Sequence, residues 1–436
     1  MKIIIYSLFL SVFLLDYLQG IGVLPRIFTF LPEMLSCLVG VIVCCQLAIR
    51  KSFRLSPLYW FLFIFLALNI LAGILLNSVK PEVLFVAIRQ YFKYLPFFFL
   101  PLVYDFSEKE IKGFLLLLVC LTLIQLPIAL YQRFVLSPDF LTGDLVGGTL
   151  GAASRGSGLL TIYLICAITL LTAFRIRKRI AAHTYWLLLA LFVVPTMINE
   201  TKVTVFLLPL ALIIPAIAAE NGIHRVKSLL RVGLVAVVLL GIFIPVYDHF
   251  MAPKGRNITD FLMKDGEIEG YLLKSEEKIN VGAVGRLDAI ILPISKLSKN
   301  VVSPVFGLGI GNVSHSSLGD EFSGEFYNRY GLYVTHTIST LLWEIGIFGV
   351  LLMILFNGLL FRDASKLVNA KGLTSDIALG WVGVIFIIVI SLFYTNILGS
   401  NAISYIYWYF SGYIVAESSR LKLPNMHQAK KYLPTS

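Results

Sequence analysis

Residues 331–349 read GLYVTHTISTLLWEIGIFG. The segment begins with polar residues and continues into an apolar run that is typical of a membrane-spanning helix. His336 lies where the apolar run begins, and Glu344 lies within it. An ionisable side chain is costly in a bilayer unless it is paired or faces water. The segment therefore predicts a membrane helix whose polar residues have a structural or chemical task.

The composition of the whole chain agrees with this interpretation. Its 436 residues are 58% hydrophobic and only 14% charged, and the mean hydropathy is +0.85. So few charges cannot cover the apolar surface of a soluble protein of this length. We predict an all-α polytopic membrane protein with the lipid bilayer as its partner. The net charge of +11 then reports topology, and no nucleic acid is expected.

The apolar stretches predict about twelve transmembrane helices, each needing roughly 20 residues. The first stretch lacks a small-residue cleavage site and is interpreted as a helix, not a signal peptide. The stretch 185–199 is the shortest. The predicted intervals are 3–23, 30–49, 57–77, 82–104, 111–131, 157–174, 185–199, 201–219, 229–247, 334–361, 379–398 and 401–417.

Basic residues predict the orientation. With the N-terminus inside, the short inner segments carry 20 Lys and Arg and the short outer segments carry five. This is the positive-inside pattern, so we expect both termini in the cytoplasm. The predicted organisation is helices 1–9 over 1–247, a large external loop over 248–333, helices 10–12 over 334–417 and a cytoplasmic tail over 418–436. Loops of this length are usually functional.

Several cations lie toward the predicted outer side. Arg89 and Lys93 share one face of the fourth helix, where they either extend to the interface or face an anion in a cavity. Arg155 opens the sixth helix, where it is either a solvated interfacial residue or, among Gly and Ser, placed to bind a ligand. Lys202 follows Glu200 at an outer junction, and the two either pair or leave Lys202 facing outward.

The large loop adds a further cation, Arg286. Five apolar residues follow it at helical spacing and predict an amphipathic helix on the outer membrane surface, with Arg286 in its first turn. Those residues are Leu287, Ile290, Ile291, Ile294 and Leu297. Together with His336, these cations predict an anionic ligand, for which a lipid phosphate or diphosphate is suited. The glycine-rich run 307–311 follows no strand and predicts a turn, and Gly346 predicts close helix packing.

Four motifs in order resemble the C-terminal signature of the O-antigen ligase/polymerase family. They are GR at 285–286, SPVFGLGIGNV at 303–313, His336 at a helix start, and LLWEIGIFGVLL at 341–352. Arg155 matches the family's basic residue after a glycine-rich outer loop. Thr201–Lys202 stands where the family has Ser/Thr–Arg, and Thr337 stands where it often has Asn. The resemblance covers about residues 140–360 by motif and the rest by topology.

The resemblance implies a membrane glycosyltransferase that uses an undecaprenyl-diphosphate-linked glycan on the outer face of the bacterial inner membrane, without metal or other cofactor. It implies Arg286 and His336 as candidate catalytic residues, with His336 orienting or deprotonating the acceptor. Diphosphate binding would fall to Arg286 and Arg155, assisted by Lys202, Arg89 and Lys93. Glu344 would serve positioning and packing. A chain-length regulator is a further partner that the resemblance allows.

Three functions stay open at this stage. We favour a polymerase that joins oligosaccharide repeat units into O-antigen, exopolysaccharide or capsule. A ligase would instead transfer the glycan to lipid A core or to protein. A transporter or flippase for an anionic solute is the alternative of another class, and it predicts cations spread through the depth of the membrane.

Overall fold

A computed structural model describes residues 1–49, 55–136, 145–151, 156–220, 222–250, 257–273, 284–298, 302–316 and 318–421. Within these residues every regular element is a helix. Eight of the helices in these ranges are long and apolar enough to cross a membrane, as in a multi-pass helical membrane protein. They are α1 (Lys2–Gly20), α2 (Leu31–Ile49), α3 (Pro57–Asn77), α6 (Glu108–Tyr131), α7 (Gly156–Ile176), α10 (Gly222–Phe250), α17 (Thr337–Leu367) and α18 (Leu373–Ser391).

The remaining predicted intervals also contain helices, but these are bent, shorter or outside the set of eight. The interval 82–104 is a pair, α4 (Pro81–Phe92) and α5 (Leu95–Val103), bent by 44°. The intervals 185–199 and 201–219 correspond to the shorter apolar helices α8 (Ala182–Ile198) and α9 (Thr204–Ala219). The last interval lies in α19 (Asn401–Leu421), which is not one of the eight long apolar helices.

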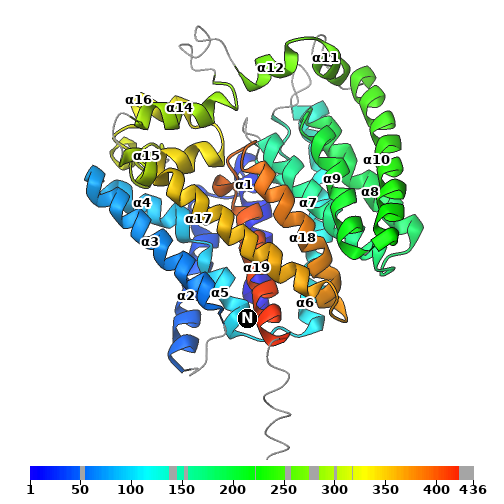
Figure 1. Cartoon of the computed structure of the whole chain (residues 1–436), viewed down its shortest axis with the longest axis horizontal. Helices are drawn as coiled ribbons and strands as arrows, with labels where there is room; N and C mark the ends of the chain where they lie inside the picture. The colour runs from blue at the N-terminus through cyan, green and yellow to red at the C-terminus, as the bar shows by residue number, and fades with distance from the viewer. Residues whose placement is uncertain are drawn as a thin grey trace, which may run out of the picture.

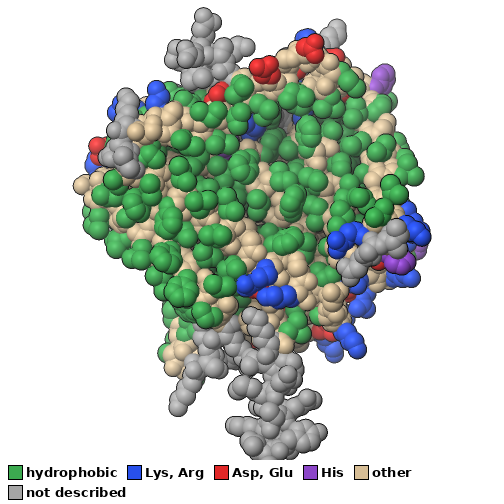
Figure 2. All heavy atoms as spheres, in the orientation of Figure 1, with side chains coloured by type: hydrophobic (Ala, Val, Ile, Leu, Met, Phe, Trp, Pro, Cys, Tyr) green, Lys and Arg blue, Asp and Glu red, His purple; other side chains and the backbone are tan. Residues whose placement is uncertain are grey.

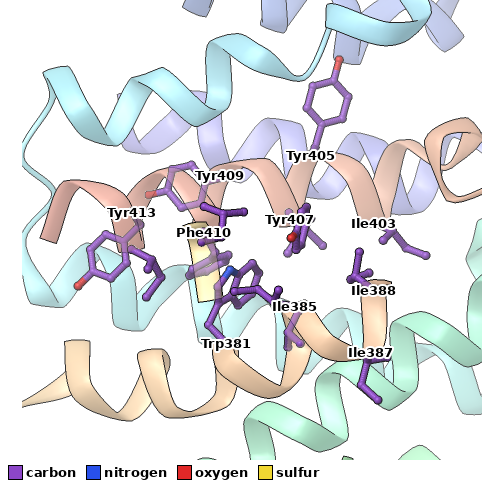
Figure 3. Packing of buried hydrophobic residues seen from close by; sticks show 14 of the residues in the cluster. Trp381, Ile385, Ile387, Ile388, Ile403, Tyr405, Tyr407, Tyr409, Phe410 and Tyr413 are labelled. Carbon is purple, nitrogen blue, oxygen red and sulfur yellow. The ribbon is translucent and has the colours of Figure 1, made fainter. Parts of the chain in front are cut away.

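The centre of the bundle is made by α7, α17, α18 and α19 (Figure 1). In the most apolar 18-residue stretch of each helix, 72% of α7 and 78% of α18 is buried inside the protein, against 11% of α10. A helix that is apolar on all sides belongs in a protein interior or in lipid. Figure 3 shows Trp381 of α18 packed beside Tyr407 and Phe410 of α19, with Trp381 and Tyr407 stacked. Gly412 lets α19 approach the backbone of Phe98, since a Cβ would lie 2.0 Å from its carbonyl oxygen.

The surface separates into an apolar belt and two polar ends (Figure 2). The first residue and the last turn of α19 lie at the same end of the molecule (Figure 1). Basic side chains gather toward that end in Figure 2. The segments of the large loop cover the opposite end. They include α11 (Ile258–Met263), α12 (Glu267–Leu272), α14 (Asp288–Leu297), α15 (Ser303–Phe306) and α16 (Tyr327–Tyr330).

The predicted amphipathic segment is the helix α14. It buries Ala289, Pro293 and Leu297, and it exposes other apolar side chains, Ile291 among them. The helix begins at Asp288, so the prediction that Arg286 lies in its first turn is wrong, because Arg286 comes two residues before it. The turn before the helix is held because Leu287 N–H donates to the Leu272 carbonyl at 2.9 Å. An acidic residue such as Asp288 is also favoured in a first helical turn.

Helix α17 is interrupted at Gly346, where φ is 68° and ψ is −173°. The interruption leaves carbonyl groups without their helical partners. The glycine-rich run 307–311 supplies replacements, because Leu308 N–H donates to Trp343 O at 2.7 Å and Gly309 N–H donates to Glu344 O at 3.0 Å. Asn69 of α3 donates to Ile345 O at 2.9 Å. Gly346 is therefore a required break in the helix and not only a packing position.

Candidate functional site

Arg286 is held in place by two tyrosines. Its Nε donates to the Tyr271 hydroxyl at 2.8 Å, and a terminal nitrogen donates to the carbonyl oxygen of Tyr394. The guanidinium also lies over both rings, with its carbon 4.2 Å from the Tyr394 centroid and 5.1 Å from the Tyr271 centroid. A guanidinium has five N–H donors, and these contacts use two of them. Arg286 is thus oriented while it keeps donors for a ligand.

His336 connects Arg286 to the start of α17. It is the N-cap of that helix, and its Nδ1 accepts a hydrogen bond from Ser339 N–H at 3.1 Å. The other ring nitrogen, Nε2, lies 3.0 Å from the backbone carbonyl of Arg286. Because Nδ1 accepts, the ring is the neutral tautomer in which Nε2 carries the proton and donates. Fully buried and engaged at both nitrogens, His336 fixes the main chain of Arg286 against α17.

An apolar cavity of about 470 Å³ lies beside Arg286, and Lys202 lines the same cavity. Both cations thus border one hydrophobic space. This is what the prediction that they bind the same ligand requires. The Lys202 ammonium lies 4.6 Å from the centroid of Phe261. The rest of the wall comes from α9, α12, α14 and α18 and is almost wholly apolar: Val203, Phe206, Leu207, Leu210, Ile268, Tyr271, Leu272, Leu287, Ile290, Ile390, Phe393 and Tyr394.

The turn that carries Lys202 is anchored to α7 by Asn199. The Asn199 amide donates to Ser157 O and to the Thr161 hydroxyl, both at 2.9 Å, and it is fully buried. The adjacent Glu200 forms an ion pair with Arg133 at 2.8 Å. Arg133 is thus one partner of Glu200, and Lys202 lines the cavity.

Arg155 lies outside the described residues, but the described segments before and after it have defined contacts. Gly158 in the first turn of α7 packs against Tyr394, since a Cβ there would lie 3.3 Å from the ring. The described part of the loop before it is held by two buried glutamines, Gln125 of α6 and Gln132 directly after that helix. Gln125 accepts from Thr149 N–H at 2.9 Å, and Gln132 accepts from Gly148 N–H at 2.8 Å.

The segment between α18 and α19 contacts both the start of α17 and Arg286. Thr337 donates from its hydroxyl to Thr395 O at 3.1 Å, and the same hydroxyl accepts from Ile397 N–H at 2.9 Å. The segment also includes Tyr394, whose carbonyl and ring hold Arg286. Thr337 thus supports the residue that orients Arg286.

Arg89 and Lys93 form a separate cluster. Arg89 makes a two-point ion pair with Glu33 of α2, at 2.5 and 2.8 Å, and Lys93 lies 3.3 Å from the same carboxylate. The exposed fractions of the Arg89 and Lys93 side chains are 29% and 15%. Neither residue lines the cavity of Arg286 and Lys202. Both pair with Glu33 and both lie away from the Arg286 cavity, so the structure gives no support to their predicted role in binding the diphosphate.

Glu344 now has identified partners. Its carboxylate accepts from the Tyr91 hydroxyl and from the Ser314 hydroxyl, each at 2.6 Å, and the side chain is fully buried. The backbone N–H groups of Gly311 and Val313 face the same carboxylate. Glu344 therefore joins α17 to α4 and to the glycine-rich run, which agrees with the predicted positioning task.

Sequence reasoning missed the residues that orient the cations. Tyr271 and Tyr394 carry no pattern that separates them from the other 18 tyrosines of the chain. Glu33 offered a signal, because an acidic residue at the start of an apolar stretch predicts a basic partner. Asn199, Gln125 and Gln132 were also detectable as polar side chains near the ends of apolar helices.

Comparison with known proteins adds no assignment. No protein-family model and no curated protein matches the chain.

Proposed function

We propose that the protein is a membrane glycosyltransferase that polymerises undecaprenyl-diphosphate-linked oligosaccharide repeat units. In this proposal it crosses the bacterial inner membrane twelve times with both termini in the cytoplasm, and it acts on the outer face. The observation that carries the proposal is the apolar cavity of about 470 Å³ bordered by Arg286 and Lys202. The order of sequence motifs that resembles the O-antigen ligase/polymerase family supports it.

The cavity suits an amphipathic donor. Its apolar wall can hold part of a polyprenyl chain, and the two cations can bind the diphosphate. Arg286 is suited to this because its planar fork pairs with two phosphate oxygens at once. Two of its donors are fixed on Tyr271 and Tyr394, so the guanidinium is oriented before the ligand arrives. Less ordering is then needed on binding.

The reaction breaks the bond between the anomeric carbon and the diphosphate oxygen. An acceptor hydroxyl forms the new glycosidic bond and loses its proton, and the lipid diphosphate leaves with the bonding electron pair. Negative charge develops on the departing oxygen. Preorganised cations beside that oxygen lower the barrier because they stabilise charge that is largest in the transition state. Arg286 and Lys202 have this role in the proposal.

His336 is assigned to positioning in place of acceptor deprotonation. A general base needs a ring nitrogen free to receive a proton from the acceptor. Both nitrogens are engaged, by Ser339 N–H and by the Arg286 carbonyl. His336 therefore acts through Arg286, whose main chain it holds.

The test is reconstitution with a synthetic polyprenyl-diphosphate oligosaccharide as both donor and acceptor. We expect polymer from the wild type and a loss of at least about 100-fold in rate for Arg286→Ala, the scale of removing one charge-stabilising donor. Arg286→Lys keeps the charge but loses the fork, and we expect an intermediate rate. Lys296→Ala, an exposed cation on the neighbouring helix α14, is the matched control and should keep the wild-type rate.

The products separate the three functions. Longer glycans on the lipid diphosphate identify a polymerase. Transfer only to added lipid A core or protein identifies a ligase. Movement of an anionic solute across the vesicle without new glycosidic bonds identifies a transporter, and that result, or polymer at the wild-type rate from Arg286→Ala, contradicts the proposal.

A further inference from the structure

A second cavity lies at the opposite, basic end of the bundle. It measures about 410 Å³ and is enclosed by α6, α7 and α8. This volume is within the range of about 300–1,000 Å³ that is usual for small-molecule sites. Its wall is mainly aliphatic and aromatic, with Leu115, Val119, Leu171, Phe174 and Phe192 among the contributors. It shares no lining residue with the cavity of Arg286 and Lys202.

A second, smaller space borders the cavity on the side of the protein core. A narrower apolar space of about 60 Å³ shares the lining residues Leu118, Ala167 and Leu170 with it. That inner space reaches Trp381 and Tyr407, which face each other between α18 and α19 in Figure 3. The two adjacent spaces outline an apolar slot that is wide at its mouth and narrow at its end, with the three shared side chains between them. A linear hydrocarbon chain fits this shape better than a compact ligand does.

Charged side chains border only the mouth. Lys112 and Arg179 line it, and both are more than half exposed. Each has an acidic partner, since Lys112 lies 2.8 Å from Glu108 and Arg179 lies 2.7 Å from Asp376. Glu108 also lines the cavity, so these two cations and their two acidic partners balance in charge. The positive surplus comes from the neighbouring residues Arg175, Arg177 and Lys178, at the end of α7 and in the turn that carries Arg179.

We propose that this slot binds an anionic phospholipid, with one acyl chain in the slot and the phosphate at Lys112 and Arg179. Basic pockets between transmembrane helices are suited to anionic head groups because juxtamembrane cations attract them. An ammonium or guanidinium has several donors, so each cation can contact the phosphate while it keeps its acidic partner. The site is distinct from the proposed donor site and does not depend on the proposed function.

The test measures lipid retention and lipid-dependent stability of the full-length protein. The protein is purified in detergent, stripped of lipid, and mixed with micelles containing either phosphatidylglycerol or phosphatidylcholine. We expect one phosphatidylglycerol molecule to be retained in native mass spectrometry and to raise the melting temperature, since a ligand that binds the folded state stabilises it. Phosphatidylcholine should be retained about fivefold less.

Two variants address the head group and the chain separately. Lys112→Gln should weaken phosphatidylglycerol retention about fivefold, whereas Lys109→Gln, an exposed lysine on the same helix that does not line the cavity, should not change it. Ala167→Phe should fill the junction of the two spaces and remove the lipid-dependent rise in melting temperature. Lys112 is exposed, so its variant tests the proposal even where Ala167→Phe fails to fold. Equal retention of both lipids, or equal retention by the Lys112 and Lys109 variants, overturns the proposal.

Discussion

At the residue scale, the polar side chains of the segment 331–349 join different parts of the molecule. His336 links the start of α17 to Arg286, and Glu344 links it to α4 and the glycine-rich run. Removing one partner of a buried hydrogen bond leaves the other without a partner, which costs about 1–3 kcal/mol. Both residues are therefore costly to change even where they touch no substrate.

The His336 cap predicts a dependence of stability on pH. His336 lies one residue before α17, and burial lowers the pKa of its imidazole, with the nearby Arg286 charge acting in the same direction and the bond to the Arg286 carbonyl opposing it. A lowered pKa favours the neutral ring in the folded state. The stabilisation is therefore complete above the ordinary histidine pKa of about 6.5 and is lost as the pH falls through the lower folded value.

The check compares melting temperatures of the wild type and His336→Asn from pH 8 down to about pH 5. Asparagine can cap the helix but does not titrate in this range. We expect the difference between the two proteins to be largest at pH 8 and to shrink below about pH 6.5. A difference in melting temperature that is constant with pH would show that protonation of His336 does not weaken the helix cap.

At the element scale, the break in α17 shows what a local pattern can and cannot reveal. The apolar run predicts one continuous span, and the glycine-rich run predicts only a turn. In the structure, Leu308 and Gly309 supply the hydrogen-bond donors that the broken helix lacks. Three glycines of that run, Gly307, Gly309 and Gly311, have φ between 72° and 90°. Such a pairing of segments 35 or more residues apart follows from tertiary packing, which helical periodicity does not encode.

The break in α17 predicts the effect of adding one methyl group at Gly346. Gly346→Ala forces a non-glycine residue to φ 68° and places a Cβ 2.2 Å from the Val305 carbonyl oxygen. We expect a loss of about 2–5 kcal/mol in stability from strain and overpacking together. The melting temperature in detergent measures it.

The same helix offers the control. Gly358 has open space around its Cβ position, so Gly358→Ala should leave stability unchanged or raise it by up to about 1 kcal/mol. Equal melting temperatures for the two variants would show that α17 is not interrupted at Gly346 in the folded protein.

At the scale of the whole molecule, the sequence predicts the class of fold better than it predicts the site. Apolar length and charge are local properties, so the long helices and the amphipathic helix α14 were predictable. Arg286 and Lys202 were singled out as charges at the edges of apolar stretches, and they border one cavity. Arg89 and Lys93 were singled out by the same argument, but both pair with Glu33 and neither borders that cavity. Which cations share a site depends on counter-charges from other helices, and spacing along one helix does not contain that information.

The predicted orientation is the property that a single labelling experiment tests most directly. The structure places α14 at one end of the molecule and the turn between α17 and α18 near the other (Figure 1). Lys296 and Lys371 are exposed at these two positions. With both termini in the cytoplasm, Lys296→Cys should react with a membrane-impermeant maleimide added to intact cells, whereas Lys371→Cys should react only after the membrane is opened. The parent protein is the control, because its five cysteines lie in apolar helices where an aqueous reagent has little access. The reverse pattern would place the Arg286 cavity on the cytoplasmic side, where a polymerase of exported glycans could not use it.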